Sequence, residues 1–321
     1  MNPKILLAGS IAVDYILKTP GKFGECVRMD GDKVGCALMA DTRTVHFGGT
    51  AGNISYNLGL LEVPHYVLSR VGKDFSELGY AQHLEAPVRT LLFDTIDEDV
   101  TASCYIFNDD LANQISVFYE GAMKYKLEMD LQTQVPGIAE VSFAINAPQN
   151  VVAMLNLARE LKEMGKNMIF DPGQVTPAYS GQDLEIGLQG AYALISNEFE
   201  FNMISEKLGR SVDEMLELVP RIVTTRGGSG SVIRINGEEI LVPVVKPKAI
   251  KDTTGAGDGY RAGMVAGLAN GMDLEQSCKL GAVIGSFVVE TVGAQTQVFA
   301  RQDVEKRYEK AFGEKIELNW E

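Results

Sequence analysis

Short apolar segments alternate with amphipathic segments along most of the chain. The pattern is most regular after residue 135, where the apolar run 141–146 is followed by the segment 150–164. That segment places several apolar side chains at helical spacing on one face: Val151, Met154, Leu155, Ala158 and Leu161. Further apolar runs lie at 4–8, 65–71, 167–171, 191–196 and 221–225. Strands that alternate with helices of this length predict an α/β fold with a mostly parallel central sheet and helices on both faces.

Four other segments are extended or strand-like in sequence and predict strands outside that sheet, and one of them, 42–47, alternates polar and apolar residues. They are 12–19, 42–47, 101–107 and 114–119, and we expect them to form a second, smaller sheet. Asn236-Gly237 predicts a tight hairpin within 231–242. Asp74 predicts the start of a helix that runs to about His83.

Composition narrows the classes of function. The chain has 321 residues and a net charge of −14, which disfavours binding to nucleic acid or to an anionic membrane surface. Its four scattered cysteines indicate reduced thiols in a cytoplasmic protein, and its three histidines lack metal-ligand spacing. We see no signal peptide and no run of 18 apolar residues that would span a membrane.

The segment Asp252-Thr253-Thr254-Gly255-Ala256-Gly257-Asp258 carries the strongest chemical signal. It joins a β-branched run to an apolar run rich in small residues, so we interpret it as a strand-to-helix turn. Glycines and the N–H groups of a helix start would make an anion cradle, and Asp258 lies beside it. This arrangement suits deprotonation of a hydroxyl beneath a phosphate. The alternative is that Asp258 only caps the helix.

Other candidate motifs also follow predicted strands, at 9–14, 171–174, 196–200 and 225–230. Folds of this class bind ligands at the carboxyl ends of their strands. The sequence contains no P-loop motif and no strand-linked dinucleotide fingerprint. The second absence disfavours an enzyme that uses a nicotinamide cofactor.

Two stretches together resemble the ribokinase-like (PfkB-type) family of carbohydrate and nucleoside kinases. They are Gly48-Gly49-Thr50-Ala51-Gly52-Asn53 and the segment 252–258, and the resemblance covers the whole chain as one kinase domain, 1–321. Residues 9–14, 19–23, 114–123 and 171–174 are most similar to bacterial-type adenosine kinases. The resemblance implies a discontinuous β-sheet lid built from about 14–47 and 95–125. It also implies transfer of the ATP γ-phosphoryl group to the ribose 5′-hydroxyl of adenosine.

The resemblance implies a role for each matching residue. Asp258 would be the general base, with the N–H groups of Gly255, Ala256 and Gly257 as the anion hole. The nucleoside would be bound by Ser10, Asp14, Gly49, Asn53, Phe118 and Gln174. ATP would be bound by Asn197, Thr225, Gly227 and Gly230. Glu200 would organise Mg²⁺, largely through water. Whether K⁺ is needed stays open, and lid-to-lid contact predicts a homodimer.

The sequence departs from the adenosine kinase pattern at one position. Cys104 stands where a second lid aromatic is expected, with Tyr105 and Phe107 nearby. Specificity for another nucleoside or a sugar is therefore the first alternative. A non-catalytic nucleotide-binding protein is the second, although such a protein would be expected to lack Asp258 or a cradle glycine.

Overall fold

The computed structural model describes residues 4–111, 113–125 and 130–320. A large sheet of nine strands forms its centre. In spatial order these are β15 (Glu238–Val242), β14 (Ser231–Ile235), β13 (Arg221–Thr225), β12 (Ala193–Asn197), β11 (Asn167–Phe170), β10 (Phe143–Asn146), β1 (Ile5–Ala8), β6 (His65–Gly72) and β7 (Arg89–Ile96). Strands β13 to β7 pair in parallel, whereas β14 and β15 are antiparallel. The predicted mostly parallel sheet is confirmed.

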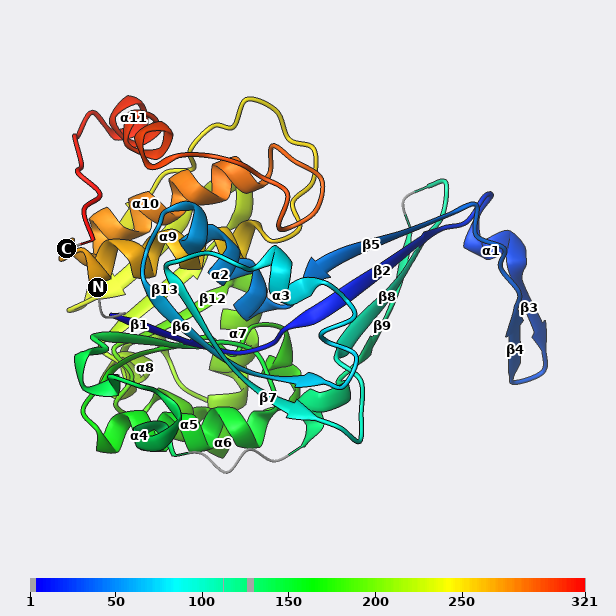
Figure 1. Ribbon diagram of the computed structural model, residues 1–321, viewed down its shortest axis with the longest axis horizontal. Helices are drawn as coiled ribbons and strands as arrows, with labels where there is room; N and C mark the ends of the chain where they lie inside the picture. The colour runs from blue at the N-terminus through cyan, green and yellow to red at the C-terminus, as the bar shows by residue number, and fades with distance from the viewer. Residues whose placement is uncertain (1–3, 112, 126–129, 321) are drawn as a thin grey trace.

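Helices cover both faces of this sheet (Figure 1). Alternate residues of β1 show the division, because Ile5 and Leu7 enter one core cluster while Leu6 and Ala8 enter the other. The first cluster packs under α2 (Thr50–Leu60), α9 (Ala256–Ala269), α10 (Leu274–Val288) and α11 (Arg301–Phe312). The second packs under α4 (Leu131–Gln134), α5 (Val151–Glu163), α6 (Gly181–Leu188), α7 (Glu198–Leu208) and α8 (Val212–Leu218). Both faces of the sheet are therefore buried, as its unbroken apolar strands require.

A second sheet forms the lid and projects from the body (Figure 1). Its order is β5 (Thr42–Gly48), β2 (Ala12–Lys18), β8 (Ala102–Asn108) and β9 (Gln114–Tyr119). These are the four segments expected to form the smaller sheet. Beyond the lid strands lie the short helix α1 (Phe23–Cys26) and an exposed hairpin of β3 (Val27–Asp30) and β4 (Lys33–Cys36), neither of which was expected from the sequence.

The prediction of a helix from Asp74 to about His83 was wrong in its extent. Only α3 (Tyr80–His83) is helical there, and it starts after Gly79, which has a φ of +74°. The Asp74 carboxylate instead accepts hydrogen bonds from the N–H and hydroxyl of Thr101, at 2.7 and 2.8 Å. The Asp74 carboxylate, which was expected to cap the helix, is therefore engaged in a tertiary contact with Thr101.

Short 3₁₀ helices complete the connections at η1 (Gly121–Lys124), η2 (Ile138–Glu140), η3 (Gly173–Ala178) and η4 (Gly227–Ser229). Within the described ranges, no helix combines the length and apolar character needed to cross a bilayer.

Candidate active site

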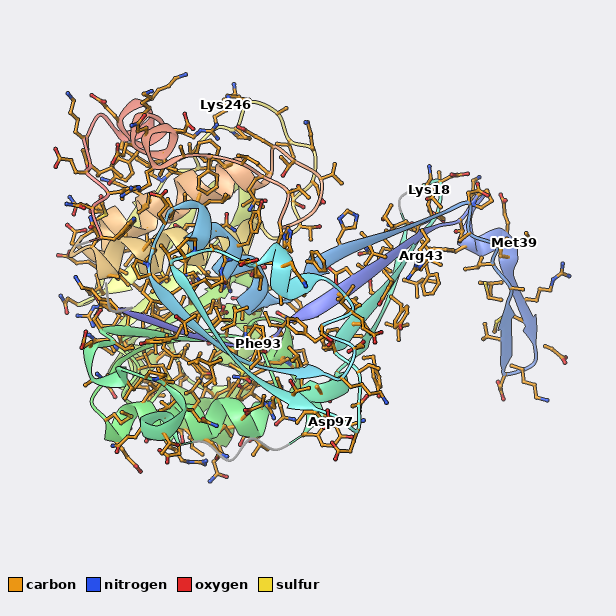
Figure 2. The ribbon with its side chains drawn as sticks, in the orientation of Figure 1. Lys18, Met39, Arg43, Phe93, Asp97 and Lys246 are labelled. Carbon is orange, nitrogen blue, oxygen red and sulfur yellow. The ribbon has the colours of Figure 1, made fainter. Side chains whose placement is uncertain are left out.

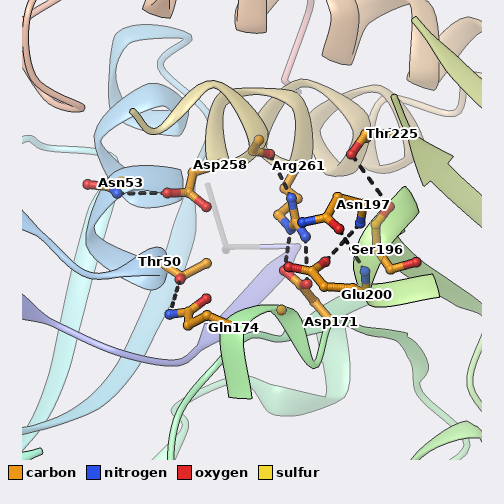
Figure 3. Close-up of polar contacts among 12 residues, drawn as sticks. Thr50, Asn53, Asp171, Gln174, Ser196, Asn197, Glu200, Thr225, Asp258 and Arg261 are labelled. Carbon is orange, nitrogen blue, oxygen red and sulfur yellow. Dashed lines mark hydrogen bonds and ion pairs between the residues drawn. The ribbon is translucent and has the colours of Figure 1, made fainter. Parts of the chain in front are cut away.

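A cavity of about 280 Å³ opens at the carboxyl edge of the large sheet. Asp171 follows β11, and Asn197 and Thr225 end β12 and β13, so three neighbouring parallel strands deliver polar residues to one place. The full lining is Thr50, Pro148, Asp171, Gly173, Gln174, Asn197, Glu200, Thr225, Gly227, Gly257, Asp258 and Arg261. Figure 3 shows most of these side chains converging from both sides of the cavity. Many residues expected from the sequence to bind substrate, ATP or metal therefore lie together.

Asp258 lies in the first turn of α9, directly after the glycine turn. Gly255 precedes the helix with a φ of +77°, and a Cβ there would lie 2.5 Å from the Cβ of Ala294. Only glycine fits this position without strain. The Ala256 N–H donates to the Thr253 carbonyl at 3.2 Å. For the N–H groups of Gly255 and Gly257 we find no protein acceptor among the described residues. The first turn of α9 thus presents donors and a partial positive charge beside Asp258.

Burial raises the pKa of Asp258 to about 7. The Arg261 guanidinium and a hydrogen bond from Asn53 act in the opposite direction and favour the ionised carboxylate. Asn53 Nδ2 donates to Asp258 Oδ2 at 2.7 Å (Figure 3). A carboxyl group that titrates near neutral pH is suited to accept a proton from an alcohol.

A buried hydrogen-bond network fixes the orientation of the Asn53 amide. Gln295 Nε2 donates to Asn53 Oδ1 at 2.9 Å and to the Tyr80 hydroxyl at 2.6 Å. The Tyr80 hydroxyl in turn donates to the Gly48 carbonyl at 2.6 Å. Because Asn53 Oδ1 is held as an acceptor, its NH₂ group faces Asp258. Sequence reasoning missed Gln295 and Tyr80, which lie 242 and 27 positions from Asn53 and carry no local motif.

A buried ion pair contacts the first turn of α9. Arg261 Nη2 donates to Asp171 Oδ1 at 2.7 Å, and its Nε also contacts Asp171 Oδ2. Both side chains are nearly inaccessible, at 6% exposure for Arg261 and none for Asp171. Arg261 Nη1 donates to the Gly257 carbonyl at 3.1 Å. Arg261 was not expected as a site residue, although an arginine in a small-residue helix, three positions after Asp258, is a usable signal.

The expected ATP side of the site is organised by a helix cap. Asn197 Oδ1 accepts from the Glu200 N–H, and Glu200 Oε2 accepts from the Asn197 N–H, both at 2.8 Å. Thr225 and Gly227 line the same cavity. Gly230 does not line the cavity, and its carbonyl accepts from the Arg226 N–H at 2.7 Å.

The residues fit a divalent metal held mainly by ATP and water. In the described part of the chain, no group of three His, Cys, Asp or Glu residues could hold a metal ion on its own. Glu200 faces the cavity, and burial raises its pKa. Mg²⁺ keeps several waters and needs few protein carboxylates, so this donor set suits it in the presence of nucleotide phosphates.

Ser10 and Gly49 meet at the start of α2. The Ser10 hydroxyl accepts from the Thr50 N–H at 2.9 Å and is itself buried. Gly49 has a φ of +82°, and a Cβ there would lie 2.6 Å from the Ser10 carbonyl oxygen. Gln174 Nε2 donates to Thr50 Oγ1 at 3.4 Å (Figure 3). The expected sugar and base contacts therefore adjoin one helix start.

Asp14 and Phe118 lie on the lid, outside the lining of the cavity. Strand register pairs His46 with Asp14, Asp14 with Cys104, and Cys104 with Phe118. Residues in one such row point to the same face of a sheet. Burial raises the pKa of Asp14 to about 6. Cys104 thus stands between the two residues expected to hold the sugar and the base.

The family model for pfkB family carbohydrate kinases matches residues 4–300. The chain belongs to the pfkB family. This confirms the family expected from the two glycine motifs.

Nucleoside kinases of two other organisms match nearly the whole chain. The nucleoside kinase of Methanocaldococcus jannaschii is 33% identical over 314 residues, which cover 96% of this chain and 97% of the relative. The structure of Burkholderia thailandensis nucleoside kinase in complex with inosine has a TM-score of 0.80 at 29% identity, covering 97% of this chain and 99% of that one. The crystal structure of the Methanocaldococcus jannaschii enzyme also has a TM-score of 0.80, at 29% identity, covering 96% and 99% of the two chains. The ribokinase-like fold is thereby confirmed.

Proposed function

We propose that the protein is an ATP-dependent nucleoside kinase that phosphorylates the ribose 5′-hydroxyl of adenosine, a purine salvage reaction. The observation that carries this proposal is the partly buried Asp258 carboxylate in the first turn of α9, which lines the cavity at the sheet edge. Whole-length relatives that are nucleoside kinases support the substrate class.

In the proposed reaction, Asp258 accepts the proton of the 5′-hydroxyl while that oxygen attacks the γ-phosphorus of ATP. The new P–O bond forms as the bond to the β-phosphate oxygen breaks, which gives AMP and ADP. The N–H groups of Gly255 and Gly257 would face the charge on the transferring group, whereas the Ala256 N–H already donates to the Thr253 carbonyl. Mg²⁺, bound by the ATP phosphates near Glu200, would neutralise part of the phosphate charge.

The nucleoside is proposed to lie between the body and the lid. Asn53, Gly49, Ser10 and Gln174 would contact it from the body, and Asp14 and Phe118 from the lid. A carboxylate that only accepts hydrogen bonds suits a pair of ribose hydroxyls. We propose that residues 14–47 and 95–125 close as this lid and exclude water from the phosphoryl group.

A substrate panel tests the proposal and its nearest alternative. We expect ADP release with adenosine to exceed that with guanosine, cytidine, ribose and fructose 6-phosphate. Inosine belongs in the panel because the Burkholderia thailandensis enzyme binds it and because Cys104 replaces a lid aromatic. The panel is run with K⁺ and with Na⁺ to test the cation requirement. ATP binding without phosphoryl transfer to any compound would favour a non-catalytic protein.

The outer face of the lid supports the proposed homodimer. Opposite the Asp14 row, Tyr15 pairs with Val45 and Tyr105, and Tyr105 pairs with Val117. Val45, Tyr105 and Val117 are exposed large apolar side chains on this one face. Such a contiguous apolar face marks an interaction surface.

We expect light scattering to give about twice the 34.9 kDa mass of the chain. Val117→Lys should shift the protein to a monomer, because a charge would be buried in the interface. Val152→Lys, at an exposed valine on α5, is the matched control and should leave the dimer intact. A monomeric wild-type protein would rule out this dimer.

A further inference from the structure

A second concave surface lies away from the candidate active site. This groove has a volume of about 680 Å³ and lies between α10, α11 and the segment that follows β15. Figure 2 labels Lys246 on that segment, beside α11. Its lining shares no residue with the active-site cavity. A volume of this size suits a small molecule.

The charge of the groove is opposite to that of the chain. Its lining contains five cationic residues, Lys246, Lys248, Lys306, Arg307 and Lys310, against the two acids Glu290 and Asp303, a net charge of +3. The whole chain carries −14. A local cationic surface on an acidic protein attracts small anions while the remaining surface repels large ones.

Both acids in the groove are already engaged. Arg307 contacts both oxygens of Glu290, at 2.9 and 3.2 Å, and Glu290 also accepts from the Lys248 N–H at 2.7 Å. Asp303 accepts from the Ala300 N–H at the start of α11. Among the described residues, the amines of Lys246, Lys306 and Lys310 have no hydrogen-bond or ion-pair partner. Three ammonium groups are therefore free to contact a ligand.

Apolar residues share the lining with the lysines. They are Val245, Pro247, Phe287, Val298 and Ala311. The Arg307 guanidinium lies over the Phe287 ring, 3.4 Å from its centroid, which fixes one cation in place. A ligand that fills the groove would thus combine several negative charges with an apolar or aromatic part.

We propose that this groove is a binding site for a nucleoside triphosphate, whose phosphate chain is held by Lys246, Lys306 and Lys310. A concave site with separated ammonium groups matches an extended polyphosphate better than a single carboxylate. The segment that lines the groove continues to Asp252, and the Lys251 N–H donates to the Val289 carbonyl at 2.8 Å. The bound nucleotide therefore contacts the same segment that leads into the catalytic turn.

Binding stoichiometry tests the proposal with a non-hydrolysable ATP analogue. We expect calorimetry to find two sites per chain in the wild-type protein and one in Lys306→Gln/Lys310→Gln. Losing two charge-assisted contacts should weaken the groove site by at least about tenfold. The matched control, Lys73→Gln/Lys162→Gln, removes two exposed lysines outside the lid and both sites and should keep both sites. The groove site should also weaken as salt rises.

The same experiment separates this inference from the proposed function. If the active site does not bind ATP, the wild-type protein shows one site and the Lys306→Gln/Lys310→Gln protein none. Equal stoichiometry and affinity in the wild-type and Lys306→Gln/Lys310→Gln proteins would overturn the groove site. Inorganic tripolyphosphate tests whether the groove recognises the nucleoside or only the phosphate chain. Weaker binding of tripolyphosphate than of the ATP analogue supports a nucleoside triphosphate as the ligand. Equal binding would overturn the proposal that the groove recognises a nucleoside.

Discussion

Asp258→Asn is expected to lower turnover by roughly 10²–10⁴-fold while nucleoside affinity is mostly kept. The substitution keeps the shape of the side chain and its capacity to accept from Asn53 Nδ2, which lies 2.7 Å from the carboxylate. It removes the group that would accept the hydroxyl proton. Steady-state kinetics with saturating ATP and nucleoside gives the turnover, and calorimetry gives the affinity.

The pH profile gives this prediction a second readout. Because burial raises the pKa of Asp258 to about 7, the base is protonated below that pH. The kcat/KM of the wild-type enzyme should therefore fall about tenfold per pH unit below 7 and level off above it. Asp258→Asn should lose this limb. Asp213→Asn, at an exposed acid in α8, should keep both turnover and profile. Near-normal turnover in Asp258→Asn would remove Asp258 from the base role.

The sequence predicted the elements whose cause is local. Asn236 and Gly237 both have positive φ, at 52° and 79°, as the tight hairpin requires. The two glycine motifs carry their geometry in the residues themselves, because Gly49 and Gly255 occupy backbone conformations that other residues rarely adopt. The short apolar runs at 4–8, 65–71 and 141–146 likewise predicted buried strands of the large sheet.

Features that depend on distant partners could not be predicted in this way. Arg261 and Asp171 are 90 positions apart, and Gln295 and Asn53 are 242 apart. Tertiary packing brings the two members of each pair together, and the spacing of apolar residues along the sequence does not predict such contacts. Asp74 illustrates a different error. Its sequence context predicts a helix cap, but its carboxylate accepts a hydrogen bond from the distant Thr101 instead. The sequence thus identified the expected base and cradle but not the buried groups that hold and tune them.

Those buried groups determine the second large effect. Arg261→Met is expected to lower the free energy of unfolding by about 3–5 kcal/mol, because it leaves the fully buried Asp171 carboxylate without its partner. Chemical denaturation followed by circular dichroism measures the loss. Arg159→Met, at a surface arginine of α5, is the matched control and should change stability by less than about 0.5 kcal/mol.

The double variant Arg261→Met/Asp171→Asn distinguishes loss of pairing from loss of packing. Removing both charges should recover part of the stability, which a double-mutant cycle measures as a coupling energy. A pH readout then tests the link to catalysis. Because the Arg261 charge lowers the pKa of Asp258, Arg261→Met should move the acid limb of kcat/KM to higher pH. If Arg261 serves packing alone, the limb stays near pH 7 and the coupling energy is close to zero. A shifted limb with strong coupling would mean that one buried arginine both stabilises the catalytic turn and keeps its carboxylate ionised.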